Sequence, residues 1–446
     1  MTTEPASTAA ATLAAPTSVR AFAPHPRRAD ILGEVHARPF RPATAPRVFL
    51  HYAFAAGRDE IEADRAFLDR LCRARGASGP SDTARHHVVA VGGGTLKWER
   101  HAEFVGYTWD GPATDAARLF PELPSSHPFG NEFVQPGPLL VAVRLDLLAD
   151  RGDLAAAVAP FDPASLCVSE AYGGAGVAIT DFRQDGDGHT RILVLDRGLN
   201  PQQAGALVQR LIEIEAYRTL AMLGLPVAQG LGPEVGRIER DLAAITGAIR
   251  TSEGLAANRD LLEKISGLTA DLEAHVASSA WRFGATRAYD QIVKDLTALL
   301  HEHHVPGYGT WTNFLARRSD PAMRTVASIQ ERMNDLSRKL ARAAQLLRTR
   351  VDIDLEQQNR DLLSSMNARS RQQLMLQQTV EGLSVAAVSY YVVGLVGYLL
   401  KAAKEAHLLP IDASVATGLA VPVVLAAVWA LVRSIRKAHA PDGDGH

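Results

Sequence analysis

Three groups of polar residues have the types that acid–base chemistry uses, an acid beside a base or a cation. They are Glu34, His36 and Arg38, then Glu99 and His101, and then Glu170, Asp181 and Arg183. Such a group can line a cleft, but a buried ion-pair network or a solvated face is the commoner outcome. The sequence has no Gly-x-Ser-x-Gly or His-Glu-x-x-His motif and no cysteine–histidine pattern. It therefore predicts no catalytic constellation.

His301 and His303, on either side of Glu302, have the spacing of a His-x-His metal-ligand pair. The two would share one face on a strand, whereas the sequence places them where a helix ends. The helix dipole favours histidine at that end without any metal. We therefore predict no metal and no other cofactor. The glycine run 92–94 is expected to be a tight turn, because no Gly-Lys-Ser/Thr follows it as in a phosphate loop.

Composition excludes several classes of protein. The 446 residues carry a formal net charge of −2 and a pI of about 6.7, so no basic excess points to a nucleic-acid partner. Two cysteines, Cys72 and Cys167, are too few for a disulfide framework or a cysteine zinc knuckle. Residues 1–24 are expected to be a disordered lead-in, since they are rich in Ala and Thr and lack the basic start of a signal peptide.

Residues 25–200 are predicted to form an α+β cytoplasmic domain with an antiparallel or mixed sheet. A helical spacing of apolar residues marks 61–75. Runs of alternating or β-branched residues mark the strands, at 47–56, 86–91, 96–107, 139–147, 166–170, 176–182 and 190–195. Short turns such as Asp185-Gly186-Asp187-Gly188 join several of them, so hairpins should dominate.

Residues 201–320 are predicted to be all-helical. Asn200 is a favoured N-cap, and Pro201 suits the first helical position. Apolar stripes at helical spacing mark two further helices, at 235–249 and 261–276.

A single long helix is predicted over 321–381, which contains neither Gly nor an internal Pro after Pro321. Its apolar residues follow alternating steps of three and four, the seam of a coiled coil. They are Val326, Ile329, Met333, Leu336, Leu340, Ala343 and Leu347, continued by Val351, Leu355, Leu362 and Met366. A straight helix of this length would measure about 90 Å. We expect this stalk to associate with other copies of the chain through residues 326–366.

Two uncharged runs at the C-terminal end, 382–400 and 414–432, are each 19 residues long. As helices they would reach about 29 Å, close to the hydrocarbon thickness of a bilayer. Pro422 is compatible with this, because transmembrane helices tolerate proline where neighbours satisfy the freed carbonyl. We predict a transmembrane hairpin of two helices joined by an external loop, 401–413; the alternative is a hairpin buried in a large soluble core.

Positive charges beside the two runs set the expected orientation. Arg369, Arg371, Arg433, Arg436 and Lys437 flank them on one side, against Lys401 and Lys404 in the connection. The positive-inside rule then places the body and the tail 433–446 in the cytoplasm. The expected location is the inner (cytoplasmic) membrane, with both termini in the cytoplasm.

Several stretches resemble a bacterial family of predicted membrane-anchored proteins of unknown function. The likeness spans most of residues 25–436. The stretches are ILGEVHARPF (31–40), LKWERHAEF (96–104), CVSEAYGGAGVAITDFR (167–183), RILVLDRGLNPQQAGALVQRLIEIEAYRTLAMLGLP (191–226) and TVEGLSVAAVSYYVVGLVGYL (379–399). The resemblance implies a membrane anchor and brings no reaction with it.

The order of the predicted parts is also similar to that of CorA-type divalent-cation channels. In that family the first membrane helix ends in Gly-Met-Asn, which forms the ion entrance. Here the corresponding place is Gly397-Tyr398-Leu399-Leu400 followed by Lys401, and a lysine is unfavourable at a cation entrance. If the chain did conduct ions, the resemblance implies that the candidate pore-lining residues are Ser384, Ser389, Tyr390, Gly394 and Gly397.

The leading hypothesis is a non-enzymatic, membrane-anchored, homo-oligomeric protein whose cytoplasmic part binds a protein or a small ligand, as a binding or scaffold module. The first alternative is a CorA-like divalent metal-ion transporter that lacks the entrance motif. The second is a membrane-tethered hydrolase that uses Glu34, His36 or His101.

Overall fold

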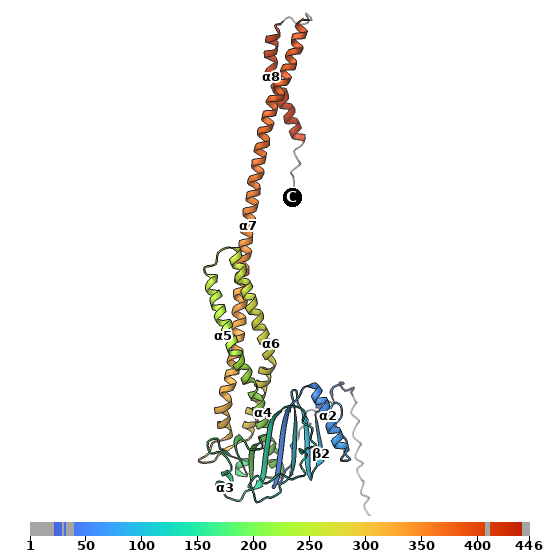
Figure 1. Cartoon of the computed structure of the whole chain (residues 1–446), viewed down its shortest axis with the longest axis vertical. Helices are drawn as coiled ribbons and strands as arrows, with labels where there is room; N and C mark the ends of the chain where they lie inside the picture. The colour runs from blue at the N-terminus through green and yellow to red at the C-terminus, as the bar shows by residue number, and fades with distance from the viewer. Residues whose placement is uncertain (1–21, 29–30, 33–39, 406–410, 439–446) are drawn as a thin grey trace, which may run out of the picture. The chain divides into compact units, whose positions relative to one another are not determined.

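The computed structural model describes residues 22–28, 31–32, 40–405 and 411–438. Two compact units divide the chain: residues 1–243 with 267–340, and residues 244–266 with 341–446. We call the first unit the head. Figure 1 traces the chain from the strands of the head through the long helices to the C-terminal pair.

The head is built on a mixed sheet, as predicted, of nine described strands in the order β2-β3-β4-β1-β5-β8-β7-β6-β9. Strands β5 and β8 pair in parallel, and the other described neighbours pair antiparallel. The strands are β1 (Arg47–Ala55), β2 (His86–Val91), β3 (Gly94–Arg100), β4 (Phe104–Pro112), β5 (Leu139–Ala149), β6 (Cys167–Ala171), β7 (Gly176–Gln184), β8 (Thr190–Asp196) and β9 (His303–His304).

The strand prediction was wrong at one place and incomplete at another. Residues 96–107, expected to form one strand, belong to two, because the chain reverses at 101–103 and the His101 N–H donates to the Phe104 carbonyl at 2.9 Å. Strand β9 was not predicted. Its two residues are too few to show a pattern, and they pair with Ser169 and Glu170 at the sheet edge.

Helices cover both faces of this sheet. The helices and the short 3₁₀ turn are α2 (Arg58–Arg73), α3 (Leu154–Val158), η1 (Tyr172–Gly174), α4 (Pro201–Met222), α5 (Gly224–Ile249), α6 (Leu255–Leu299), α7 (Trp311–Glu405) and α8 (Ala413–Ala438). One core joins a sheet face to α4 through side chains such as Val143, Ile192 and Leu211. A second core joins the opposite face to α2 around Trp98, Tyr107 and Leu68.

Helix α7 begins at Trp311, earlier than the predicted start at Pro321, which lies inside the helix. The reason is tertiary: Trp311 is fully buried and Leu315 nearly so, both in the core beside α4, so the first turns of α7 belong to the head. The Glu302 carboxylate accepts the backbone N–H groups of Trp311 and Thr312 at 3.0 and 2.8 Å. It thereby satisfies donors that a helix start leaves unpaired.

Within the head, the seam predicted for a coiled coil is buried in its own chain. Val326, Leu336 and Leu340 are buried. Polar contacts beside them reach α5 and α6: Arg332 pairs with Glu239 at 2.7 Å, and the Ser337 hydroxyl donates to Glu273 at 2.9 Å. These apolar residues are therefore already covered by helices of the same chain.

In the second unit, the ends of α5 and α6 pack against α7. The Arg350 guanidinium donates to the Ile249 carbonyl, and the Asn258 amide donates to Asp354 at 2.8 Å. Beyond this contact α7 is largely exposed as far as residue 380, with Leu362 at 62% and Leu376 at 71% of full exposure.

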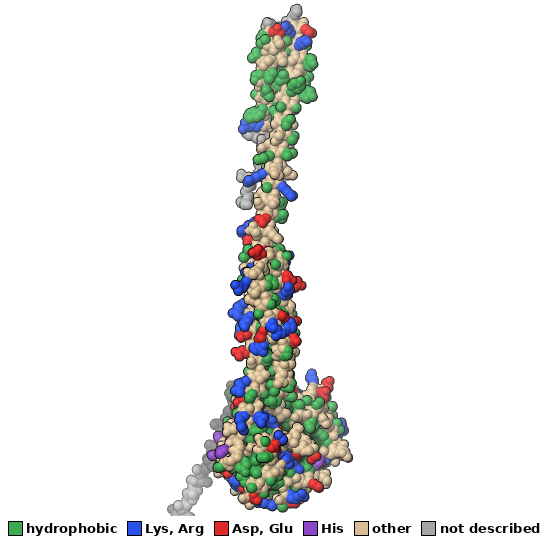
Figure 2. All heavy atoms as spheres, turned by 60° about the vertical axis from the view of Figure 1, so that its left-hand side comes forward, with side chains coloured by type: hydrophobic (Ala, Val, Ile, Leu, Met, Phe, Trp, Pro, Cys, Tyr) green, Lys and Arg blue, Asp and Glu red, His purple; other side chains and the backbone are tan. Residues whose placement is uncertain are grey.

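Two helices are long and apolar enough to cross a membrane: α7, through its last part, and α8, over Ala413–Ser434. Only 6% of the most apolar window of each is buried within the chain. Figure 2 shows this region as mostly hydrophobic and uncharged surface, with charged side chains near its ends. Large side chains such as Tyr390, Tyr398 and Trp429 are exposed there.

Candidate functional site

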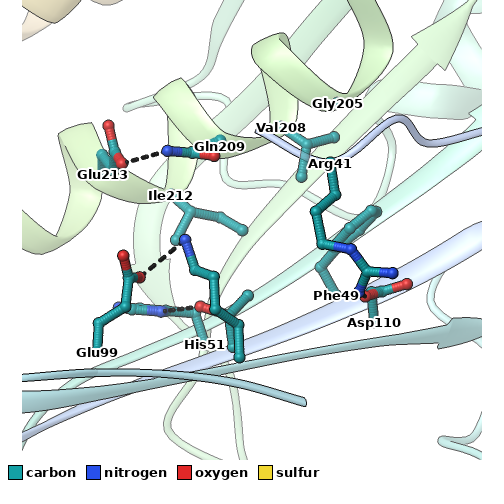
Figure 3. A pocket seen from close by; sticks show the side chains of 12 residues that line it. Arg41, Phe49, His51, Glu99, Asp110, Gly205, Val208, Gln209, Ile212 and Glu213 are labelled. Atoms are coloured by element: carbon teal, nitrogen blue, oxygen red, sulfur yellow. Dashed lines mark hydrogen bonds and ion pairs between the residues drawn. The ribbon is translucent and has the colours of Figure 1, made fainter. Parts of the chain in front are cut away.

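A cavity of about 80 Å³ lies between α4 and the sheet face that α4 covers (Figure 3). Its lining combines charged, polar and apolar side chains. The lining residues are Arg41, Phe49, His51, Lys97, Glu99, Thr108, Asp110, Gly205, Val208, Gln209, Ile212 and Glu213.

Strand register creates the polar wall of this cavity. His51 of β1 lies opposite Thr108 of β4, which in turn lies opposite Lys97 of β3, so the three share one row across the sheet. In the next row, Glu99 lies opposite Gly106. A Cβ on Gly106 would come within 3.5 Å of the His51 ring, so the missing side chain leaves room beside the imidazole.

Helix α4 forms the opposite wall. Gly205, Val208, Gln209, Ile212 and Glu213 recur at the spacing of a single helix face. The predicted cap fixes where that face begins, because the Asn200 side chain accepts the Gln203 N–H and the Gln203 side chain accepts the Asn200 N–H. Gly205 also lets the chain at Arg41 approach, since a Cβ there would clash with the Arg41 carbonyl oxygen.

Ion pairs hold several of the charged side chains of the wall. Lys97 and Glu99 are 2.8 Å apart, and Asp110 pairs with Arg47 at 2.5 Å and more loosely with Arg41 at 3.7 Å. On α4, the Gln209 amide donates to Glu213 at 2.8 Å. The side chains of Lys97 and Glu99 are 18% and 11% exposed, so this pair is largely withdrawn from water.

His51 is the most buried titratable group of the cavity. Burial lowers the pKa of its imidazole to about 4; Lys97 and His101 lower it further, and Glu99 opposes them. The imidazole is therefore neutral at pH 7. Its Nδ1 lies 2.9 Å from the Thr108 hydroxyl, whereas its Nε2 is buried and has no hydrogen-bond partner among the described residues.

An unpaired buried nitrogen is costly, since such a group forfeits its hydrogen bonds to water. A molecule in the cavity that bonds to Nε2 would remove this cost. None of the residues that line the described cavity is a cysteine or serine, and Thr108 is already bonded to His51. The arrangement is suited to holding a small polar molecule.

Of the three predicted polar groups, the one formed by Glu99 and His101 lies at or beside the cavity. Glu99 lines the cavity, and His101 stacks on Phe104 nearby with ring centroids 3.9 Å apart. Glu34, His36 and Arg38 lie outside the described residues.

Glu170, Asp181 and Arg183 each have partners outside their predicted group. Glu170 pairs with Arg197 at 2.7 Å, and Arg183 pairs with Asp162 at 2.8 Å. The Asp181 carboxylate accepts the backbone N–H groups of Asp162 and Arg183. Their contacts are those of structural ion pairs and turns.

His301 and His303 are both exposed, and His303 lies on the edge strand β9. Among the residues that the structure describes, no group of three His, Cys, Asp or Glu side chains could hold a metal ion. The residue between them, Glu302, caps α7 instead.

The candidate pore-lining residues differ in how deeply they are buried along α7. Ser389 is buried, and Gly397 is half-buried beside Thr417 of α8, where a Cβ on the glycine would lie 3.3 Å from the threonine methyl. Ser384, Tyr390 and Gly394 are exposed. Gly397 therefore lies against α8 in the hairpin.

Sequence reasoning missed most of the cavity, including Arg41, His51, Asp110 and Glu213. One signal was present: His51 is a polar residue inside the otherwise apolar and aromatic run of β1. Alternation places it on the same face as Phe49 and Ala53, which are both buried.

The fold and the cavity define a class of protein: an α+β head with an internal polar cavity, on a chain that carries two candidate membrane-spanning helices. Residues 23–439 match the family described as "Protein of unknown function (DUF3422)". The match covers most of the chain, which therefore belongs to this family and confirms the resemblance to an uncharacterised family. No curated protein and no solved structure matches the chain.

Proposed function

We propose that this chain is a membrane-anchored binding protein whose head holds a small polar molecule in the cavity between α4 and the sheet. The observation that carries the proposal is the buried, unpaired Nε2 of His51 inside a cavity walled by charged side chains. Native proteins pair such groups almost without exception, so a ligand or ordered water is the natural partner.

The anchor in this proposal is the pair of apolar stretches, 382–400 and 414–432. Their length, apolar character and exposed aromatic side chains support it. The excess of positive charge beside them supports an orientation at the inner membrane with the head and the tail in the cytoplasm and the connection 401–413 outside.

Self-association completes the proposal. Between the α5–α6 contact and the apolar stretches, α7 exposes Leu362, Met366, Leu376 and Val380. Apolar side chains on one lone helix are stable in water when they pack against another copy. Small residues further along, such as Gly394 and Gly397, allow close approach of helices in lipid.

The anchor is tested by fractionation. The full chain should sediment with membranes and resist extraction by alkaline carbonate, whereas a chain ended at Thr379 should stay in the supernatant. If both forms remain in the supernatant after ultracentrifugation, the anchor is refuted.

Binding is tested on the full chain in lipid nanodiscs, by the thermal shift of tryptophan fluorescence with a panel of small acids, amines, amino acids and polyols. A molecule that binds the folded state raises the melting temperature. We expect at least one class to do so for the wild type and for Gln202→Ala, an exposed control on α4.

The molecules that raise the melting temperature of the wild type should not raise that of His51→Phe or of Ile212→Phe. These two substitutions fill the cavity from its two walls. The two variants are independent, so that one can replace the other if it does not fold. A panel without any effect, or equal shifts in a folded filled variant, would overturn the binding function.

A second candidate is a CorA-like divalent-cation transporter. The order of the parts favours it: an α+β head, long helices and two apolar helices at the C-terminal end (Figure 1). Proteoliposomes that hold the pure protein would then take up magnesium, cobalt or nickel. Absence of flux for all three removes this candidate.

A further inference from the structure

We propose that a second cleft of the head, beside the start of α7, binds the phosphate group of a small organic phosphate monoester. This site is separate from the cavity between α4 and the sheet, and it does not depend on the function proposed for that cavity. Three observations lead to the inference: the segments that build the cleft, the charges that line it, and a buried hydroxyl without a partner.

Two loops and a helix build the cleft. Residues 163–166, which lead into β6, form one side, residues 307–309 form another, and α7 forms the third. The two loops are joined where the Val168 N–H donates to the Gly309 carbonyl at 2.9 Å. The cleft measures about 580 Å³, which lies within the roughly 300–1,000 Å³ that sites for small molecules usually have.

The only charged side chains that line the described cleft are two arginines, Arg317 and Arg318, which are adjacent on α7 and both exposed. The Arg317 Nε donates to the Asn313 carbonyl at 3.3 Å, and the Arg318 guanidinium lies 5.8 Å from the centre of the Phe314 ring. Neither arginine forms an ion pair with an acid among the residues that the structure describes. A guanidinium has five N–H donors, so both arginines have donors available for a ligand.

Acids of the neighbouring segments have other partners. Asp162, just before the first loop, pairs with Arg183 at 2.8 Å, and its second carboxylate oxygen accepts the Ala164 N–H. The Glu302 carboxylate accepts backbone N–H groups at the start of α7. Neither acid lines the cleft. The two positive charges of the cleft therefore match a phosphate monoester, which carries about −1.5 to −2 at pH 7.

A serine hydroxyl favours an anion with several oxygens. Ser165 lines the cleft, and its Oγ is buried without a hydrogen-bond partner among the described residues. One phosphate oxygen can accept from this hydroxyl while the other two accept from the arginines, whereas a carboxylate has only two oxygens. Leu166, Tyr308 and Phe314 offer apolar and aromatic surface to the organic part of the ligand.

Phenyl phosphate is the probe, used in calorimetric titration of the full chain in phosphatidylcholine nanodiscs. We expect it to bind about tenfold or more tightly than phenyl sulfate, which has the same ring but one negative charge. Phenol, which has no charge, should not bind. The affinity for phenyl phosphate should fall below about pH 6, where the ester takes up a proton. Equal affinities for phenyl phosphate and phenyl sulfate would overturn the choice of a phosphate monoester.

Variants test whether the cleft is the site. Arg317→Gln and Arg318→Gln should each weaken phenyl phosphate about tenfold or more, since each removes a charge-assisted hydrogen bond. Arg324→Gln, at an exposed arginine of the same helix outside the cleft, makes the same change of charge and should leave the affinity unchanged. Ala164→Trp fills the cleft from the first loop and should abolish binding independently. Equal affinities in all three arginine variants would show only a general attraction of anions and would overturn the site.

The phosphate group can come from a soluble molecule or from a lipid headgroup, and two kinds of nanodisc separate these sources. One kind contains phosphatidic acid, a phosphate monoester, and the other contains phosphatidylglycerol, a phosphodiester, at the same total lipid charge. If the lipid occupies the cleft, phenyl phosphate binds more weakly in the first kind; a soluble ligand predicts equal affinities. Both results support the site. Absence of phenyl phosphate binding in every nanodisc refutes it and leaves the function proposed for the other cavity unaffected.

Discussion

At the scale of single residues, the head keeps several polar side chains away from water, and the partners of each determine what it can do. Asp64 accepts from the Trp98 indole and the Tyr107 hydroxyl at 2.7 and 2.6 Å, and burial raises the pKa of its carboxyl. This group is satisfied within the core. His51 differs because one ring nitrogen is left without a partner among the described residues.

His51 should make the stability of the head depend on pH. The pKa of its imidazole is about 4 in the folded state and 6.5 when histidine is exposed to water, as in an unfolded chain. Between these pH values the unfolded state therefore binds a proton that the folded state does not. Stability is therefore complete above pH 6.5 and is lost as the pH falls toward 4. The loss between pH 7 and pH 5 should be about 2 kcal/mol.

Urea unfolding of the full chain in nanodiscs at several pH values measures the slope of the free energy of unfolding against pH. His51→Asn should remove most of it, because the replacement does not titrate. His86→Asn, at an exposed histidine of β2, serves as the matched control and should keep the wild-type slope. An unchanged slope in His51→Asn would show that other groups carry the pH dependence.

At the scale of elements, the segment between α6 and α7 has a structural role. The Glu302 carboxylate accepts the backbone N–H groups of Trp311 and Thr312. The Thr310 hydroxyl accepts the backbone N–H of Asn313 at 3.2 Å. The Ser169 hydroxyl of β6 donates to Glu302 at 2.6 Å. The start of α7 is thereby tied to strand β6 by one carboxylate.

Glu302→Ala should destabilise the head by about 1–2 kcal/mol, since it leaves cap donors unpaired. Glu302→Gln, which keeps one carbonyl oxygen, should have a smaller effect. Thermal unfolding measures both, with Glu253→Ala at an exposed glutamate as the control. Equal midpoints for Glu302→Ala and the control would contradict the capping role.

At the scale of the whole molecule, the long apolar stripe of α7 has a buried part and an exposed part. Leu336 and Leu340 are buried among helices of their own chain, so an aspartate at either position would damage the fold itself. Leu362 and Met366 are 62% and 57% exposed and are therefore the residues at which contact between copies can be tested.

The double variant Leu362→Gln, Met366→Gln should lower the mass of the detergent-solubilised particle measured by light scattering, because it removes apolar contacts between copies. The thermal midpoint of the head should stay unchanged. Gln357→Ala, at an exposed polar position of the same helix, is the control. An unaltered mass in the double variant would refute association through this segment.

The sequence alone predicted the features that depend on neighbours along the chain. Asn200 and Pro201 predicted the start of α4, alternation predicted most strands, and the uncharged runs predicted two helices apolar enough to span a membrane. Local patterns fix these because helix caps, side-chain periods and hydrophobic length act within a few residues or turns.

Tertiary structure alone decided the cavity and the partners of α7. His51, Glu99 and Glu213 come from β1, β3 and α4, and they meet because strand pairing and the covering helix bring them together. No local spacing encodes such a meeting, since it depends on register between distant segments. The seam of α7 could likewise pair with any apolar stripe, and only packing assigned its first part to the same chain.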